Sequence, residues 1–451
     1  MYKYTNLFGE LIQENKKALA LKLLKCVIIS LQKNKEKKSM KRREFLMTSA
    51  LTLASTAFLA GCQKEDKKIV KKEGEIAKRK FKDLDIPLLG FGCMRLPMKG
   101  EEVDMAELES MVDYLMAHGA NYFDTAYMYV NEKSETSIGK ILKKYKREDF
   151  ILADKSPIYK MSSQEDVRKI FDEQLKKCQV EYFDFYMCHN INANTVDTYR
   201  KVKMYDELEK LKKEGKIKYI GFSFHGTPEI LKQVVKEHKW DFCQLQINYL
   251  DWDIVKAKEQ YEIAQAENIP VTVMEPLRGG GLVKLSEKAL AKLKEHDPNV
   301  KPAEFGLRWA ASRKNVITVL SGMSNLQQVK ENVDTFMNYK DMTPEEEKIA
   351  DETAKVIQSQ GEINCTGCKY CMEVCPKGIN IPATFALYNQ YKVDNRAFGL
   401  KLYYETLDES ERPDKCIKCN LCTKNCPQNL KIPELLAKVQ SEYDKVKDMK
   451  R

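Results

Sequence analysis

Residues 122–129 read Tyr-Phe-Asp-Thr-Ala-Tyr-Met-Tyr, a short apolar run that ends in an aspartate and continues into a turn. Eight such apolar runs occur along the chain, at 88–93, 122–124, 150–153, 183–189, 217–223, 242–248, 271–275 and 316–321. Amphipathic helical patterns such as 202–214 separate them. This alternation predicts an α/β fold, a (β/α)8 barrel over residues 81–340, with the site at the carboxyl ends of the strands. A doubly wound sheet is the rival, but Gly90-Phe91-Gly92 lacks the remaining glycine spacing of a dinucleotide turn.

The composition fits a folded chain of more than one domain. Its 451 residues are 43% hydrophobic and 31% charged, which excludes a wholly disordered or fibrous protein. The net charge of +10 is concentrated at the start: residues 1–62 hold 12 Lys and Arg against 4 Asp and Glu, which leaves 64 against 62 for the rest. We therefore expect no nucleic-acid partner.

Polar residues end several of these runs. Asp124 closes 122–124 and Tyr129 lies in the following turn, while Lys155 follows 151–154 and His189 follows 183–188. Together, and in this order, they resemble the catalytic Asp, Tyr, Lys and His of the aldo/keto reductase family. Residues 208–217 and 221–223 also resemble family sequence. The resemblance covers the whole barrel and implies reduction of a small-molecule carbonyl, or oxidation of an alcohol.

The chemistry of carbonyl reduction explains these four residue types. The carbonyl oxygen needs a proton as negative charge develops on it, and Tyr129 is the expected donor. A tyrosine ordinarily has a pKa near 10, so the ammonium of Lys155, held by Asp124, is expected to ease its ionisation. His189 is expected to orient the carbonyl by a hydrogen bond.

The resemblance also implies positions for a nicotinamide cofactor. Ser223, Gln246 and Asn248 correspond to the nicotinamide end, and the segment 321–332 to the phosphate and adenosine end, through Gly322, Ser324, Gln328 and Asn332. Two departures stand out. Met274 lies where many relatives place an aromatic ring, and only Lys330 is basic near the expected 2′-phosphate. The second departure favours NADH over NADPH. Four barrel cysteines are expected to be buried small hydrophobes: Cys93, Cys178, Cys188 and Cys243.

Eight cysteines form two identical runs, C-x2-C-x2-C-x3-C-P, offset by 51 residues. The runs are Cys365, Cys368, Cys371 and Cys375, then Cys416, Cys419, Cys422 and Cys426. This spacing resembles two-cluster ferredoxins, in which the fourth cysteine of each run binds the other 4Fe–4S cluster. The resemblance implies one cluster on Cys365, Cys368, Cys371 and Cys426, and another on Cys416, Cys419, Cys422 and Cys375. Zinc and disulfides are the alternatives.

Helical patterns at 384–390 and 396–407 indicate a small helical ferredoxin-type domain over residues 361–440. A helix beginning near Thr343-Pro344 is expected to link it to the barrel, over residues 341–360. Because a ferredoxin-type domain exchanges single electrons, a redox partner protein is expected.

The amino-terminal segment resembles an export signal. Residues 40–62 combine Arg42-Arg43, one apolar run and Leu59-Ala60-Gly61-Cys62, as in a twin-arginine lipoprotein signal. We expect export and a lipid anchor at Cys62 on a membrane surface, with a cytoplasmic protein as the alternative. Residues 1–39 are an extension that is expected to precede the true start at Met40, and residues 63–80 read as a solvated tether.

Three hypotheses for the activity follow. The first is a nicotinamide-dependent carbonyl reductase whose clusters exchange electrons with a partner. The second is an electron-transfer or partner-binding protein whose barrel uses no nicotinamide. The third is a redox enzyme whose barrel keeps the acid–base residues and draws its electrons from the clusters. No flavin motif is visible that would join two-electron and one-electron transfer.

Overall fold

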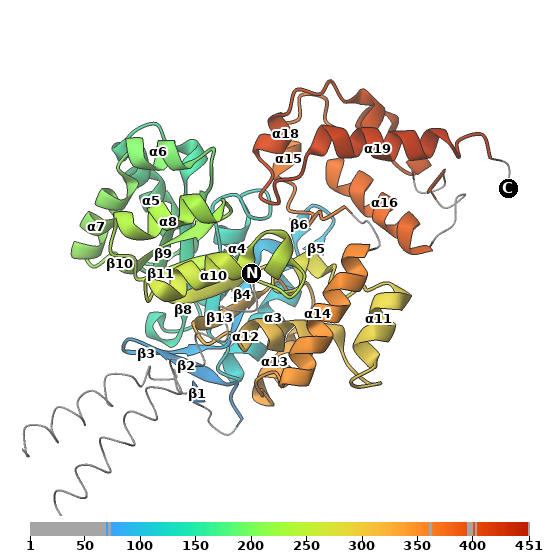
Figure 1. Cartoon of the computed structure of the whole chain (residues 1–451). Coiled ribbons are helices and arrows are strands. Elements are labelled where there is room, and N and C mark those ends of the chain that lie inside the picture. The colour runs from blue at the N-terminus through green and yellow to red at the C-terminus, as the bar shows by residue number, and fades with distance from the viewer. Residues whose placement is uncertain (1–68, 71–73, 360–362, 395–399, 402–403, 450–451) are drawn as a thin grey trace, which may run out of the picture. The chain divides into compact units, whose positions relative to one another are not determined.

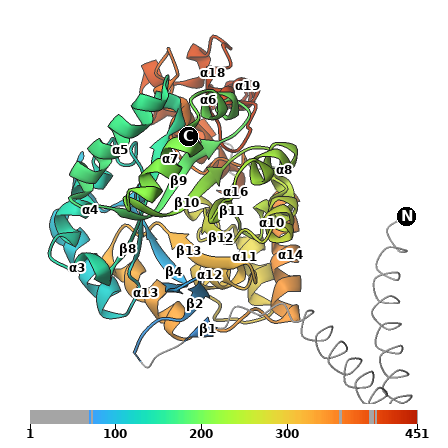
Figure 2. The same ribbon diagram turned by 90° about the vertical axis from the view of Figure 1, so that its left-hand side faces the viewer.

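The computed structural model describes residues 69–70, 74–359, 363–394, 400–401 and 404–449. Eight parallel strands close into a barrel in the order β10-β11-β12-β13-β4-β7-β8-β9, and helices surround them (Figures 1 and 2). The strands are β4 (Leu89–Gly92), β7 (Tyr122–Asp124), β8 (Ile151–Pro157), β9 (Phe183–Ile191), β10 (Ile217–Phe224), β11 (Phe242–Gln246), β12 (Val271–Met274) and β13 (Val316–Ser321). The predicted (β/α)8 barrel is confirmed, and each of its strands overlaps one of the eight runs.

Several of the helices that follow the strands have clear start signals. In α5, the Ser163 side chain accepts from the Asp166 amide while the Asp166 carboxylate accepts from the Ser163 amide. Proline occupies the first turn of α8 and α12. The helices are α3 (Met105–Ala117), α4 (Ser134–Leu142), α5 (Gln164–Cys178), α6 (Val196–Lys201), α7 (Met204–Lys213), α8 (Pro228–Glu237), α9 (Asp251–Ile254), α10 (Ala257–Ala266), α11 (Glu287–Lys294), α12 (Pro302–Ala311) and α13 (Leu326–Met337).

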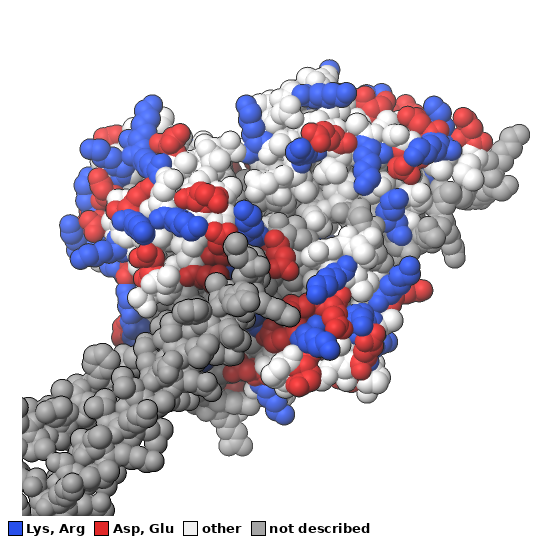
Figure 3. Space-filling model, in the orientation of Figure 1, with Lys and Arg blue, Asp and Glu red and all other residues white. Residues whose placement is uncertain are grey.

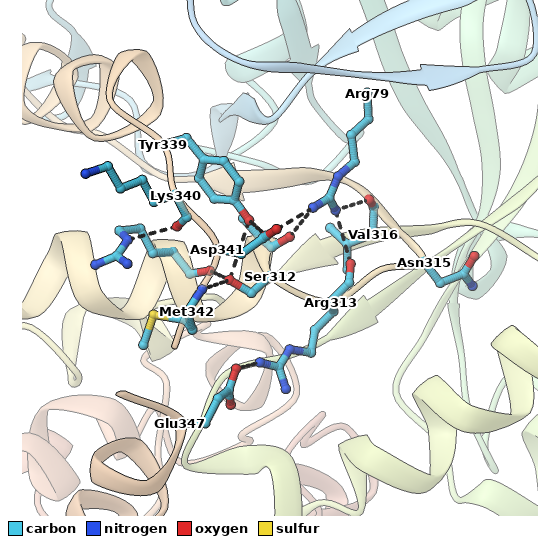
Figure 4. A network of polar contacts seen from close by, with 12 residues as sticks. Arg79, Ser312, Arg313, Asn315, Val316, Tyr339, Lys340, Asp341, Met342 and Glu347 are labelled. Carbon is cyan, nitrogen blue, oxygen red and sulfur yellow. Dashed lines mark hydrogen bonds and ion pairs between the residues drawn. The ribbon is translucent and has the colours of Figure 1, made fainter. Parts of the chain in front are cut away.

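An antiparallel hairpin that the sequence analysis did not predict precedes the barrel. It consists of β2 (Lys78–Phe81) and β3 (Leu84–Pro87). The buried Arg79 side chain of β2 donates to the carbonyls of Ala311 and Val316 at 2.7 and 2.6 Å, in the polar network of Figure 4. Because Val316 begins β13, this network fastens the hairpin to the amino-terminal end of the barrel, opposite the end where chemistry is expected.

Helix α14 (Pro344–Ser359) follows the barrel and packs on it. A capping box starts the helix, since the Thr343 hydroxyl accepts from the Glu346 amide and the Glu346 carboxylate accepts from the Thr343 amide. Its Ala350, Ala354 and Ile357 belong to the barrel's hydrophobic core. The segment expected as a linker is therefore also an outer layer of the barrel.

The cysteine-rich region is helical and has its own core. Its helices are α15 (Tyr370–Glu373), α16 (Ile381–Asp394), α18 (Leu421–Lys424) and α19 (Ile432–Asp444). Phe385, Tyr388 and Leu436 are among the side chains buried between them. Helix α16 contains the helix expected at 384–390, whereas part of the one expected at 396–407 lies outside the described residues.

Charges of both signs are interspersed on the face shown in Figure 3, in keeping with the small excess of positive charge after residue 62. Within the described ranges, no helix is long and apolar enough to cross a membrane. The signal-like segment 40–62, the extension 1–39 and half of the tether 63–80 lie outside those ranges. The described end of the predicted tether is not solvated, because Ile76 and Ala77 are buried in the barrel core and residues 78–80 belong to β2.

Candidate active site

A cavity of about 450 Å³ lies among residues at the carboxyl ends of the barrel strands. Asp124 at the end of β7, Tyr129 in the turn after it and His189 in β9 all line this cavity. Lys155 in β8 is fully buried beside it. The structure thus brings the four predicted catalytic residues to one end of the barrel.

Lys155 and Asp124 form a buried ion pair. Lys155 Nζ lies 2.5 Å from Asp124 Oδ1 and donates to the Thr125 carbonyl at 2.6 Å. The side chains are 0% and 3% exposed. The second carboxylate oxygen accepts from Gln244 Nε2 at 3.0 Å. Each charge therefore has partners within the protein, as a buried ion pair requires.

Tyr129 keeps its proton firmly in this setting. Burial, and then the carboxylates of Asp124 and Glu275, raise the pKa of its hydroxyl well above the usual value. Lys155 Nζ lies 4.8 Å from the centre of the tyrosine ring, and within the described residues its hydrogen bonds go to Asp124 and Thr125 instead of to the Tyr129 hydroxyl. Tyr129 is thus held in its proton-donor form, while easing of its ionisation by Lys155 stays a prediction.

Two histidines, not one, line the cavity. Burial, followed by the positive charge of Lys155 and then by the neighbouring His225, lowers the pKa of His189 well below its usual value. Burial likewise lowers the pKa of His225 to about 4. Both imidazoles are therefore neutral at neutral pH and can donate or accept a hydrogen bond. The sequence analysis missed His225, although it lies two residues after the apolar run 217–223 and directly follows β10, much as His189 ends its own run.

Glu275 is a second residue that the sequence analysis did not single out. It lines the cavity directly after β12, and its Oε2 is buried without a hydrogen-bond partner among the described residues. Burial raises the pKa of its carboxyl, so this group holds a proton at a higher pH than a solvated glutamate does. Its position as the last residue of an expected strand was the available signal.

Five of the seven predicted cofactor residues line the cavity: Ser223, Gly322, Ser324, Gln328 and Asn332. The polar groups of this loop already have partners within the chain. The Ser324 amide donates to Gln328 Oε1 at 2.8 Å, and its hydroxyl donates to the Arg95 carbonyl at 2.9 Å. The segment 321–332 therefore fits one end of an extended cofactor, provided that these bonds rearrange.

Gln246 and Asn248 have a different place in the structure. Gln246 exchanges two amide hydrogen bonds with Gln428 of the cysteine-rich region, both at 2.8 Å, and donates to Asp251 at 2.7 Å. Asn248 also donates to Asp251, at 2.7 Å. The amide group expected to hold a nicotinamide is thus engaged by the chain itself, and a nicotinamide at this end of the site would have to displace Gln428.

The same network fastens the first cysteine run to the barrel. Arg278 Nε contacts buried Asp251 at 2.9 Å, and its other two nitrogens contact the side chain and carbonyl of Asn364, each at 3.1 Å. Arg95 donates to the Thr366 carbonyl at 3.0 Å. Asn364 and Thr366 flank Cys365, so the anchoring contacts lie directly beside a predicted cluster ligand.

The eight cysteines gather around two small cavities in a crossed arrangement. One cavity is lined by Cys365, Cys368, Cys371 and Cys426. The other is lined by Cys375, Cys416, Cys419 and Cys422. These are the two groups expected from the ferredoxin-like spacing. Within the described residues, no group of three or more His, Cys, Asp or Glu is placed to hold a single metal ion.

The surroundings of the cysteines suit 4Fe–4S clusters. Apolar side chains such as Ile381 line both cavities, and backbone amides face the sulfurs, including Gly367 N at 3.4 Å from Cys365 Sγ. Burial raises the pKa of the Cys365 and Cys426 thiols, while nearby backbone amides lower it. Apolar walls and amide–sulfur hydrogen bonds are features with which proteins tune such clusters.

The first group of cysteines adjoins the active-site cavity. Cys368, Thr366, Tyr370 and Gln428 line the same cavity as Tyr129 and His189. The structure thus places a predicted cluster ligand and the predicted catalytic residues around one space. The fold predicted for each domain separately did not indicate that the two domains meet at this cavity.

Known proteins show the same barrel. A sequence model described as the aldo/keto reductase family matches residues 88–354. The chain belongs to the aldo/keto reductase family. It is similar to L-galactose dehydrogenase of Arabidopsis thaliana, with 26% identity over 60% of this chain and 91% of that protein. An uncharacterised oxidoreductase of Bacillus subtilis is 27% identical over 59% of this chain and 92% of its own length.

Among solved structures, an aldo-keto reductase from Bacillus halodurans in its holo form resembles the chain, with a TM-score of 0.52 and 27% identity. The match covers 63% of this chain and 96% of that one. A separate model, described as a 4Fe-4S dicluster domain, matches residues 364–430. The protein is therefore an iron–sulfur oxidoreductase of the aldo/keto reductase family with electron-transfer groups.

Proposed function

We propose that this protein interconverts a small-molecule carbonyl and its alcohol at Tyr129, with electrons that pass between the substrate cavity and the first group of cysteines. One observation carries the proposal: Cys368 lines the same cavity as Tyr129 and His189. A substrate in this cavity would touch the proton donor on one side and the electron-transfer side of the protein on the other.

The residues supply the protons that the reaction requires. Reduction of a carbonyl to an alcohol takes up two electrons and two protons. The clusters, when bound, would supply electrons one at a time. Tyr129 donates a proton to the carbonyl oxygen, and the neutral His189 orients that oxygen by a hydrogen bond. The second proton goes to the carbonyl carbon, and Glu275, which lines the cavity with a raised pKa and an unpartnered buried oxygen, is the candidate donor.

Nicotinamide-dependent reduction is the second candidate function. The loop 321–332 favours it, because Gly322, Ser324, Gln328 and Asn332 line the cavity. If a nicotinamide binds, we expect NADH in preference to NADPH, since Lys330 is the one basic residue of this loop. The bonds between Gln246 and Gln428 favour the first proposal.

Location is a further part of the proposal. The sequence of residues 40–62 supports export by the twin-arginine route and a lipid anchor at Cys62. We expect labelled fatty acid at Cys62, and we expect Arg42→Lys with Arg43→Lys to retain the protein in the cytoplasm. A mature protein that keeps residues before Cys62 and carries no lipid would contradict this assignment.

The decisive experiment compares electron donors in the anaerobically purified protein. Tyr129→Phe is expected to lower turnover by roughly 10²–10⁴-fold with little change in substrate affinity. Tyr249→Phe is the matched control, because the Tyr249 hydroxyl is buried without a partner among the described residues and lies outside the cavity lining. NADH and chemically reduced clusters serve as alternative donors. Equal turnover of wild type and Tyr129→Phe with both donors would mean that Tyr129 is not the proton donor, and the electron-transfer function would then be favoured.

The clusters are tested separately from activity. We expect about eight irons per chain, with acid-labile sulfide and low-temperature EPR signals after reduction. Cys371→Ala is expected to remove the signal of one cluster and to leave that of the other. Bound zinc without sulfide would exclude the clusters and, with them, the proposed route of electrons.

A further inference from the structure

The second cysteine run exposes a short continuous surface. Residues 417–421, which we call the 417–421 surface, are all exposed and are centred on Cys419. The Ile417 side chain is 57% exposed and that of Leu421 is 45% exposed. These are two of only six large hydrophobic residues exposed to this degree within the described part of the chain. Two exposed apolar side chains on either side of a predicted cluster ligand indicate a contact surface.

The internal repeat shows how the equivalent surface is used. At the offset of 51, Ile417 corresponds to Thr366 and Leu421 to Tyr370. Thr366 is buried and its carbonyl accepts from Arg95 of the barrel, while Tyr370 lines the active-site cavity. The first copy of this surface is thus docked on the barrel of the same chain. Residues 417–421 of the second copy stay exposed, although the Asn194 side chain of the barrel donates to the nearby Lys424 carbonyl.

The sequence around the second cysteine run carries only positively charged side chains. Residues 415–433 contain four lysines and no acidic residue. Lys415 pairs with Asp414 at 2.9 Å, and Lys431 lies 4.0 Å from Glu434. Lys418 and Lys424 are exposed and make no ion pair within the described residues. Two uncompensated positive charges therefore border the apolar side chains.

Lys418 has a left-handed backbone, like the residue at the corresponding position of the first copy. Lys418 adopts a φ of +57°, and the corresponding residue of the first copy is Gly367, with a φ of +68°. Glycine adopts this conformation freely, whereas a residue with a β-carbon is strained there. Lys418 thus places a charged side chain directly beside Cys419, where the first copy has only Gly367.

We infer that the 417–421 surface, bordered by Lys418 and Lys424, docks an acidic protein that carries single electrons. This inference rests on the proposed function, because it assumes that the second group of cysteines holds a cluster. In the transfer, the carrier loses one electron and the cluster at Cys375, Cys416, Cys419 and Cys422 gains it. No covalent bond or proton moves. Electrons then continue to the first group of cysteines, beside the cavity.

The test measures binding and electron transfer with a defined probe, an acidic flavodoxin. We expect Lys418→Glu with Lys424→Glu to slow cluster reduction by reduced flavodoxin about tenfold at low salt, with the difference lost at high salt. Ile417→Ser with Leu421→Ser should weaken binding of the oxidised flavodoxin about tenfold at either salt, measured by calorimetry. Lys236→Glu is the control, because it reverses an exposed charge on α8 of the barrel.

The outcomes separate this inference from the proposed function. Dithionite should reduce the clusters of every variant to the same EPR spectrum, which shows that the domain is intact. If dithionite reduces them but flavodoxin binds wild type and both surface variants equally, or binds none of them, the docking surface is wrong while the proposed function stands. If the surface variants convert a wild-type dimer to a monomer, the occupant is a second copy of the chain and the inference is also wrong.

Discussion

The buried pair of Lys155 and Asp124 gives a prediction whose size can be worked from the structure. Lys155→Met removes the ammonium from beside a carboxylate that is 3% exposed. Asp124 then keeps only the amide of Gln244 as a partner among the described residues, and the Thr125 carbonyl loses its 2.6 Å donor. Breaking a buried pair from one side typically costs about 3–5 kcal/mol, because the remaining charge is uncompensated. We expect a loss of stability in this range.

The double variant tests the reason for this loss. In Asp124→Asn with Lys155→Met neither charge of this pair remains, so we expect about half or more of the lost stability to return. The exposed pair of Lys232 and Glu259, at 2.9 Å, provides the control. Its side chains are 54% and 41% exposed, so Lys232→Met is expected to leave stability nearly unchanged.

Tryptophan fluorescence during anaerobic denaturation provides the assay. All three tryptophans, Trp240, Trp252 and Trp309, lie in the barrel, so their signal reports on the barrel and not on the cysteine-rich region. Free energies follow from the midpoint and slope of the transition. A Lys155→Met variant that loses less than about 1 kcal/mol, or a double variant less stable than the single one, would refute the argument from an uncompensated charge.

Three further predictions concern the edges of the site. Burial lowers the pKa of His225 to about 4 in the folded protein, from its usual 6.5, so the unfolded chain takes up a proton first as the pH falls. The free energy of unfolding should therefore decrease as pH falls from about 6.5 toward 4, by at most about 1.4 kcal/mol per pH unit. His225→Gln should flatten this slope in denaturation measured across pH. Gln428→Ala leaves the buried Gln246 Oε1 without its donor, while Gln246 Nε2 keeps Asp251, and should cost about 1–3 kcal/mol. Fluorescence titration should then show tighter NADH binding if the nicotinamide route exists, and unchanged NADH affinity would count against that route. Gly279→Ala places a β-carbon at a φ of +65° and 2.3 Å from the Thr366 carbonyl oxygen, which lies beside Cys365. The variant should therefore alter the EPR signal of the cluster at the first group of cysteines and leave that of the other cluster unchanged. Two unaltered signals would show that this contact is not maintained in solution.

The sequence by itself determined the barrel, and its resemblance to two-cluster ferredoxins implied the crossed grouping of the cysteines. Strand runs such as 183–189 carry a local signal, since buried parallel strands read as continuous apolar segments. A polar residue after such a run can be placed at the carboxyl end of the barrel without coordinates. The cysteine spacing is equally local, because cluster geometry fixes the distance between ligands along the chain.

Only the tertiary structure decided which residues of the two domains meet. The bonds between Gln246 and Gln428 join residues 182 positions apart, and neither glutamine has a pattern that predicts the other. The free oxygen of Glu275 and the lowered pKa of His225 also depend on neighbours from several strands. Local sequence records backbone period and ligand spacing, whereas burial and contact between domains arise from the packing of distant segments. The shared cavity of Cys368 and Tyr129 belongs to this second class, and it is the feature on which the proposed function rests.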